Sequence, residues 1–400
     1  AADALTKGAQ GQLILDRSPF YGESGGQVGD SGLLTSNKGS FHVTDTQKQG
    51  EFLIHLGEVV EGQIAVNDTL VAQVKADERQ AITLNHSATH LMHAALRELL
   101  GEHVTQKGSL VTAERLRFDF SHTSSVSSAE LQAIEAKVNE EILANSGVNK
   151  EVMSIADAKE QGAMALFGEK YGDEVRVVSM GGKFSTELCG GCHVERTGDI
   201  GLFKIVSESG IAAGVRRIEA VTGAGALAHV AEQEQTLKAV CDLVKSGLDG
   251  VQGKVQQLIS QSRSLEKELE QLKAKMVSSA GSDLASQAMN IGDVKLLAAA
   301  VEGFNPKDLR DTVDQLKNKL GSSIVLLGTA GDEGKVSLVA GVSKDLTGTV
   351  KAGELVNMVA GQVGGKGGGR PDMAMAGGSD ASQLPQAVAS VEAWVREKLG

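Results

Sequence analysis

Residues 85–93 of this chain read NHSATHLMH, and they lie in the middle of a predicted long helix. The helix is expected to begin near Asp77, which can cap it, with Gln80 three residues later completing a capping-box pattern. Gly101 is expected to end it, because glycine readily adopts the backbone conformation that follows a helix. Strand-like segments on both sides of this helix predict an α+β fold for the first half of the chain.

Two histidines in this helix have the spacing of metal ligands. His86 and His90 are four residues apart, so both imidazoles point from one face of the helix. Far downstream, residues 189–193 read CGGCH, and the two glycines let Cys189 and His193 reach one ion across a tight turn. Three imidazoles and one thiolate form a tetrahedral ligand set that suits zinc. The two pairs together predict one zinc ion per chain.

Other interpretations of these residues stay open at this point. His93 could replace one of the histidine ligands, and Cys192 could replace Cys189. A histidine pair on a helix can arise by coincidence, and a C-x2-C-H cluster also suits a redox pair or a haem attachment site. Residues 87–89 lack the glutamate of a metalloprotease helix, which excludes that class of enzyme.

Composition and charge exclude several classes of protein. The chain is 41% hydrophobic and has no run of 18 apolar residues, so it should form cores of its own and not span a membrane. Residues 1–4 lack the features of a signal peptide, and the missing initiator methionine suggests a piece of a longer protein. Three cysteines fit the reducing cytoplasm. The formal net charge of −12 argues against DNA, and an RNA partner would need a local basic surface.

The first half of the chain divides into two predicted subdomains. Residues 1–76 combine short strands with a glycine-rich loop at 24–32 and are expected to form a small β-barrel-like subdomain. Residues 77–223 contain the histidine helix, a second amphipathic helix at 128–147 and further strands. We expect this α/β region to be the zinc-binding core.

Residues 224–284 have a heptad pattern that predicts two helices, joined by a glycine turn, in an antiparallel coiled-coil hairpin. The pattern is interrupted by Glu234 and Ser262. The apolar seam consists of Leu227, Val230, Leu237, Cys241, Val244, Val255, Leu258, Leu265, Leu269, Leu272 and Met276. Such a hairpin would act as a spacer or as an oligomerisation element, and Cys241 is expected to serve packing.

Residues 285–400 alternate between strand and helix patterns and predict a compact α/β domain. Its most distinctive segment is a glycine-rich loop that contains Lys366, Gly368, Gly369 and Arg370. The backbone N–H groups and the two cations could hold phosphates or stack on RNA. The alternative is a glycine-rich turn that only closes the fold.

Several motifs resemble the editing and C-terminal parts of the bacterial-type alanyl-tRNA synthetase family. The zinc helix at 85–93 and the CGGCH segment at 189–193 match the two zinc motifs of its editing domain. The glycine motif at 20–30 (FYGESGGQVGD), residues 106–110 (QKGSL) and the segment GGGRPDMAMAGG at 367–378 match further signatures in the expected order. The resemblance therefore covers nearly the whole chain.

The resemblance implies an editing hydrolase that removes the amino acid from mischarged Ser-tRNA(Ala) and Gly-tRNA(Ala). It makes Gln106 a candidate pocket residue, with Ser24 and Gln27 on the glycine loop as further candidates; for these two, ordinary loop polarity is the alternative. It also implies that the C-terminal domain binds tRNA(Ala) and can support a homodimer.

Two departures from the family pattern matter. Cys192 stands where the family usually has threonine, and the aminoacylation domain is missing, so this chain should not activate alanine or use ATP. A free-standing editing deacylase and a non-catalytic tRNA-binding module with a structural zinc remain alternatives.

Overall fold

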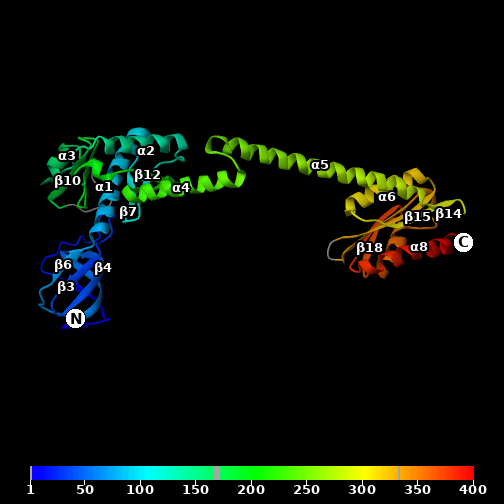
Figure 1. Cartoon of the computed structure of the whole chain (residues 1–400), viewed down its shortest axis with the longest axis horizontal. Coiled ribbons are helices and arrows are strands. Elements are labelled where there is room, and N and C mark those ends of the chain that lie inside the picture. The colour runs from blue at the N-terminus through cyan, green and yellow to red at the C-terminus, as the bar shows by residue number, and fades with distance from the viewer. Residues whose placement is uncertain (1, 165–171, 332–333) are drawn as a thin grey trace. The chain divides into compact units, whose positions relative to one another are not determined.

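The computed structural model describes residues 2–164, 172–331 and 334–400, and the side chains at 273–274 and 276–282 lie outside this description. The chain divides into two units, Ala1–Leu243 and Val244–Gly400 (Figure 1). Within the described parts, no helix combines the length and apolar character that crossing a bilayer requires.

The first unit contains an N-terminal sheet followed by a mixed region of helices and two further sheets. Its strands are β1 Ala4–Thr6, β2 Gln10–Ile14, β3 Gly32–Thr35, β4 Gly39–Gln49, β5 Phe52–Ala65, β6 Val71–Val74, β7 Gln106–Val111, β8 Leu116–Ser121, β9 Asn149–Ser154, β10 Glu174–Met180, β11 Ser185–Leu188, β12 Phe203–Ala212 and β13 Val215–Thr222. Its helices are α1 Ala76–Leu100, α2 Ser128–Leu143, α3 Ile155–Glu160 and α4 Gly223–Val244, with a 3-10 turn at Thr197–Ile200.

The N-terminal strands form an open antiparallel sheet, not the predicted barrel. The strand order is β1-β5-β4-β3-β6, and β2 also pairs with β5. Closure would require β6 to pair with β1 or β2, but the four-residue β6 pairs with β3 alone among the described strands. The long strand β5 pairs with β4 along one edge and with the short strands β1 and β2 along the other. Phe20, Phe41 and Val59 lie in the core of this sheet.

Helix α1 is the central element of the mixed region. It begins one residue earlier than predicted, with Lys75 at the N-cap and no side-chain capping hydrogen bond, so the predicted cap at Asp77 is wrong. Asp77 lies in the first turn, where its charge complements the helix dipole. Gly101 ends the helix as predicted, with φ of 118°. Every side chain from Asn85 to Leu96 is buried.

The surroundings of α1 explain this burial. It packs against α2 and the four-stranded sheet β12-β13-β8-β7, in a core that contains Leu91, Phe118 and Phe203. The capping box of α2 is formed by Ser127 and Glu130, and the helix ends four residues before the predicted 147. The three-stranded sheet β11-β10-β9 carries the CGGCH segment directly after β11.

The heptad segment at 224–284 contributes one helix to each unit. Helix α4 ends the first unit, and α5 Val251–Ser286 opens the second, after a 3-10 turn at Leu248–Gly250. Both helices were predicted, whereas their antiparallel pairing stays a prediction. Cys241 is buried. The side chain of Met276 lies outside the described residues.

The second unit is an α/β sandwich with one mixed sheet in the order β14-β15-β16-β17-β19-β18. Its elements after α5 are β14 Met289–Ile291, β15 Val294–Ala300, α6 Pro306–Leu320, β16 Ser323–Ala330, β17 Val336–Val342, a 3-10 turn at Lys344–Leu346, α7 Ala352–Gln362, β18 Lys366–Arg370, β19 Met373–Gly378, a 3-10 turn at Ala381–Gln383 and α8 Leu384–Leu399.

Alternating side chains of this sheet belong to two separate cores. Leu296 and Leu326 pack in one core with α7 and α8, whereas Leu297 and Leu327 pack in the other with α6 and the end of α5. Among the described strands of this sheet, only β15 and β16 pair in parallel, and α6 connects them. The glycine-rich loop predicted at 367–378 is in fact a hairpin, in which the edge strand β18 pairs with β19.

Candidate metal centre

Helix α1 presents two stacked imidazoles on its buried face. His86 and His90 have ring centroids 5.2 Å apart and an interplanar angle of 16°. Their side chains lie one turn apart because four residues complete roughly one helical turn. Both are almost fully buried, at 4% and 3% exposure.

The segment after β11 brings a thiol and a third imidazole to the same point. The Sγ atom of Cys189 lies 3.2 Å from Nε2 of His193 and 3.5 Å from Nε2 of His86. One ligand atom each from His86, His90, Cys189 and His193 falls within 4.8 Å of the others. The structure therefore joins the two predicted pairs, 103 residues apart in sequence, into one buried group that could hold a metal ion.

Each imidazole of the group makes a hydrogen bond through its Nδ1 atom. The Nδ1–H of His86 donates to Oε1 of Gln27 at 2.7 Å, and that of His90 donates to Oε2 of Glu187 at 2.7 Å. His193 Nδ1 lies 3.3 Å from the hydroxyl of Ser87. Since that hydroxyl donates its own proton to a backbone carbonyl, it accepts the proton of His193. All three Nε2 atoms are thereby left to face the centre.

The donor set fits a metal cation. His90 Nε2 is buried and has no hydrogen-bond partner in the described protein, which is costly unless an ion or another group meets it. Burial opposes the thiolate of Cys189, but His86 and His90 outweigh burial and hold the pKa of this thiol well below its usual value. Burial and the neighbouring His86 lower the pKa of His193 to about 3, so its imidazole is neutral. Burial opposes the charge of His90, but Glu187 and Cys189 outweigh burial and raise the pKa of this imidazole to about 10. A thiolate and neutral imidazoles are the forms that bind metals, so an ion would have to displace the proton at Nε2 of His90.

The glycine turn between Cys189 and His193 passes very close to α1. A methyl group at Gly191 would overlap the ring of His86 and approach Oε1 of Gln27 to 3.0 Å, whereas Gly190 has open space around it. The backbone N–H of Gly191 points at the Cys189 sulfur, at 3.4 Å. Gly191 is therefore required by close packing against a candidate ligand.

The geometry distinguishes the alternatives that the spacing left open. Cys189 lies in the group, whereas Cys192 does not and is half-buried. The backbone N–H of Cys192 donates to Oε1 of Gln27 at 2.9 Å. His93 also lies outside the group, and its Nδ1–H donates to Oε1 of Glu187 at 2.8 Å.

The three candidate pocket residues have different positions. Gln27 is fully buried beside His86. The glycine loop docks on β7 through two backbone hydrogen bonds, from Val28 N–H to Val111 O and from Val111 N–H to Gly26 O. The side chain of Gln27 therefore contacts a candidate metal ligand. Ser24 is exposed on the same loop, and Gln106 is half-buried at the start of β7. Roles for Ser24 and Gln106 in a substrate pocket remain proposals.

The candidate tRNA-binding residues line the edge strand β18. Lys366 and Arg370 are exposed, and Nε of Arg370 lies 3.5 Å from Oδ1 of Asp372. A methyl group at Gly368 would meet nothing within 4 Å, whereas one at Gly369 would lie 2.6 Å from the backbone of Ala374. Alternation along the strand places Lys366, Gly368 and Arg370 on the same side.

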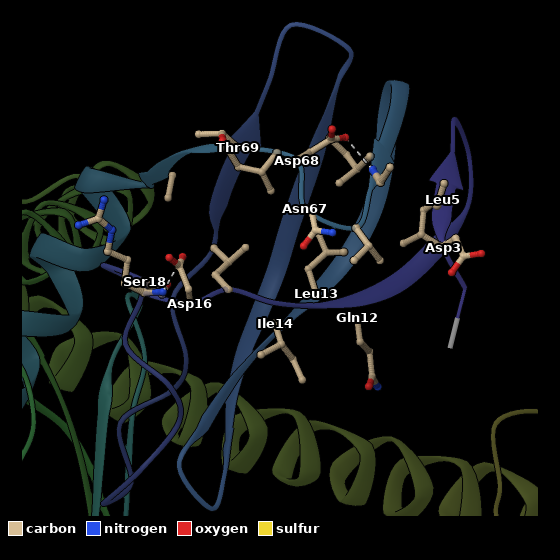
Figure 2. Close-up of a pocket in the computed structure, with 18 of the residues that line it drawn as sticks. Asp3, Leu5, Gln12, Leu13, Ile14, Asp16, Ser18, Asn67, Asp68 and Thr69 are labelled. Carbon is tan, nitrogen blue, oxygen red and sulfur yellow. Dashed lines mark hydrogen bonds between the residues drawn. The ribbon is translucent and has the colours of Figure 1, made fainter.

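A hollow of about 1300 Å³ lies in the N-terminal sheet and contains none of the four candidate ligands (Figure 2). Ser18 at its edge donates to Nε2 of the buried His55 at 2.7 Å, and the other ring nitrogen of His55 donates to Leu13 O. Burial lowers the pKa of His55, and the Ser18 hydroxyl also accepts from the N–H of Phe20. This pair therefore ties the loop before Phe20 to β5.

Sequence reasoning missed Glu187. Its carboxylate is 1% exposed and lies two residues before Cys189. The available signal was an acidic residue in a strand whose neighbours are buried, since such a residue needs a partner.

Three family models match parts of this chain. They are the model described as tRNA synthetases class II (A) at residues 1–78, the Threonyl and Alanyl tRNA synthetase second additional domain at 175–219, and the DHHA1 domain at 293–397. The second match contains Cys189 and His193.

Curated relatives match nearly the whole chain. The alanine–tRNA ligase of Saccharophagus degradans is 56% identical over 398 residues, which is 100% of this chain and 45% of the relative. That of Pseudoalteromonas translucida is 58% identical over 394 residues, or 98% and 45%. A crystal structure of the C-Ala domain from Aquifex aeolicus alanyl-tRNA synthetase is 31% identical, covers 28% of this chain and 96% of that domain, and has a TM-score of 0.25. The chain thus spans about 45% of the length of the curated relatives.

Proposed function

Because this chain belongs to the alanyl-tRNA synthetase family, we propose that it hydrolyses the ester bond of tRNA(Ala) mischarged with serine or glycine. The observation that carries this proposal is the convergence of three Nε2 atoms and one thiolate on a single buried point. That point lies partly in the segment matched by the second additional domain. We further propose that the ion is zinc, one per chain, held by His86, His90, Cys189 and His193.

The need for such a site follows from small differences between amino acids. Alanine differs from serine by one hydroxyl and from glycine by one methyl group, and each difference is worth only about 1–3 kcal/mol in a binding pocket. A synthetic site alone therefore makes errors. Size cannot exclude alanine from a site that admits serine, so polar groups have to recognise the serine hydroxyl, and Gln106 and Ser24 are our candidates.

Residues of this chain prepare the centre for the ion. Gln27, Ser87 and Glu187 fix the tautomers of the three histidines. Bound zinc would supply a positive charge that can polarise or orient the acceptor end of the substrate. We propose that the protein acts in a reducing cytoplasm, where the candidate ligand Cys189 would stay a free thiol.

We propose that the second unit binds tRNA(Ala). Lys366 and Arg370 project from an edge strand beside Gly368, where a nucleic acid backbone can approach closely. Gly369 is tightly packed on β19, so it contributes through its backbone. This arrangement would hold the RNA while its acceptor end reaches the first unit.

One observation favours a second candidate function, a tRNA-binding module with a structural zinc. All four candidate ligands are buried, and a closed set of four ligands is typical of structural sites. Zinc content alone cannot separate the two functions, because both contain the ion.

The deciding experiment measures release of serine from Ser-tRNA(Ala), with Ala-tRNA(Ala) as the control substrate. We expect the chain to hydrolyse the serine ester much faster than the alanine ester, and removal of zinc to abolish this difference. If the zinc-loaded chain binds tRNA but releases serine no faster than buffer does, the structural-zinc function is correct.

A further inference from the structure

Glu187 is a carboxylate enclosed by the protein, at 1% exposure, in strand β11 just before the ligand segment. Its two oxygens have separate partners on α1. Oε2 accepts the Nδ1–H of His90 at 2.7 Å, and Oε1 accepts the Nδ1–H of His93 at 2.8 Å. The two histidines are three residues apart, so one carboxylate spans neighbouring positions on one helical face.

The contact between Glu187 and the two histidines contributes little to folding stability, so stability alone does not explain it. A buried carboxylate without partners is strongly destabilising, and even a paired one recovers little net stability. Apolar residues at Glu187 and His93 could fill the same space. The contact instead fixes β11 against α1 at the level of the candidate metal ligands.

Two consequences for the metal follow from the geometry. With Nδ1 of His90 engaged by Glu187, Nε2 is the ring nitrogen that can bind the ion, and it is buried, unpartnered and directed at the ligand group. Cys189 follows Glu187 by two residues, so the contact also sets the distance between the thiolate and the helix. Charge supports this arrangement, since a divalent ion with one thiolate carries one excess positive charge that the carboxylate cancels.

We propose that Glu187 is the positioning residue that assembles the metal centre, with His93 as its second anchor. Glu187 holds both halves of the ligand set in register, and His93 keeps the carboxylate from rotating away from His90. This proposal rests on the proposed metal centre but is independent of the proposed hydrolytic activity.

The test is zinc affinity, measured by competition with a chromogenic chelator in the absence of tRNA. In Glu187→Gln, the amide N–H₂ would face an imidazole N–H, so one histidine must change tautomer or lose its partner. We expect zinc Kd to rise about 10–100-fold, the range that such supporting partners give. At saturating Co²⁺ the variant should still show the absorption of a four-coordinate site with a thiolate ligand, because all four ligands remain.

The matched control is Glu195→Gln, which changes a carboxylate in the same segment that is 84% exposed and pairs with Lys150. Its zinc Kd should equal that of the parent. A Glu187→Gln variant that binds zinc within twofold of the parent overturns the proposal.

His93→Phe keeps the test decisive if Glu187→Gln does not fold, because it removes the second anchor and leaves the carboxylate. We expect zinc Kd to rise by roughly tenfold, the lower end of the same range. If both variants fold, the double variant should lose no more affinity than Glu187→Gln alone, since the two changes break one contact. Unchanged affinity in His93→Phe, or additive losses in the double variant, would contradict the assigned role of His93.

Discussion

Two glycine runs of this chain, within 189–193 and 365–369, both allow close backbone packing but differ in what packs against them. In each run at least one glycine packs closely against its surroundings and another has free space. Gly191 is pressed against His86 and Gly367 against the backbone of Met375, whereas a methyl group added at Gly190 or Gly368 would meet no atom within 4 Å. The backbones of these four glycines do not have positive φ.

The difference between the runs lies in what stands beside the crowded glycine. Gly191 packs against the side chain of His86, so the missing side chain makes room for a candidate metal ligand. Gly367 packs against the neighbouring strand β19, so the missing side chain allows the two strands to approach closely. A glycine run therefore does not by itself indicate a binding loop, and only the neighbours of each glycine reveal its purpose.

The largest expected effect comes from removing the ligand that begins the first run. Cys189→Ala should weaken zinc binding by more than roughly 100-fold, beyond the loss that a supporting partner of a ligand gives. Deacylation of Ser-tRNA(Ala) should fall with zinc occupancy. Cys192→Thr is the control, because Cys192 lies outside the ligand group. Equal losses of zinc in both variants would show that Cys192 shares the ligation.

The next effect tests the crowded position itself. Gly191→Ala should displace the imidazole of His86, so that zinc Kd rises at least about tenfold and stability falls by about 1–3 kcal/mol. Chelator competition and denaturant unfolding measure the two quantities. Gly190→Ala should change neither, and the comparison between the glycines is broken if both variants behave alike.

In the second run the same substitution should affect stability without affecting zinc. Gly367→Ala would overlap Met375 O and Ala376 on β19, which should cost about 1–3 kcal/mol of unfolding free energy. Gly368→Ala should leave stability unchanged. Denaturant unfolding of the two variants decides the point, and a loss of zinc in Gly367→Ala would contradict the assignment of this run to the sheet.

The smallest expected effect concerns charge on β18. Replacing Lys366 and Arg370 with Ala should weaken tRNA binding and reduce the slope of log affinity against log salt by about 2, roughly one per phosphate contact. Filter binding at several salt concentrations measures this slope. Serine release at saturating tRNA should be unchanged, and an unaltered slope would show that neither side chain touches phosphate.

The parts of the molecule that could be predicted are those encoded by local spacing. His86 and His90 on one helical face, and Cys189 and His193 around a two-glycine turn, need no knowledge of distant residues. The heptad helices and the alternation of the C-terminal domain are likewise local patterns. Their element types agree with the structure.

What escaped prediction depends on residues distant in sequence. Glu187 meets His90 across 97 positions and Gln27 meets His86 across 59, and neither pairing leaves a local pattern. Strand β18 was mistaken for a loop, because three successive glycines lack the side chains that mark a strand. Its identity comes from β19, against which Gly367 and Gly369 pack closely.

The separation of the ligands in sequence has a consequence for synthesis on the ribosome. His86 and Cys189 are 103 residues apart, and at about 5–20 residues per second that interval takes roughly 5–20 s. During this time the nascent chain offers the ion only two of the four candidate ligands, His86 and His90. Gln27 is already present to orient His86, but Glu187 is not yet present to orient His90. Stable metal loading therefore has to wait until the segment that contains Glu187, Cys189 and His193 has left the exit tunnel.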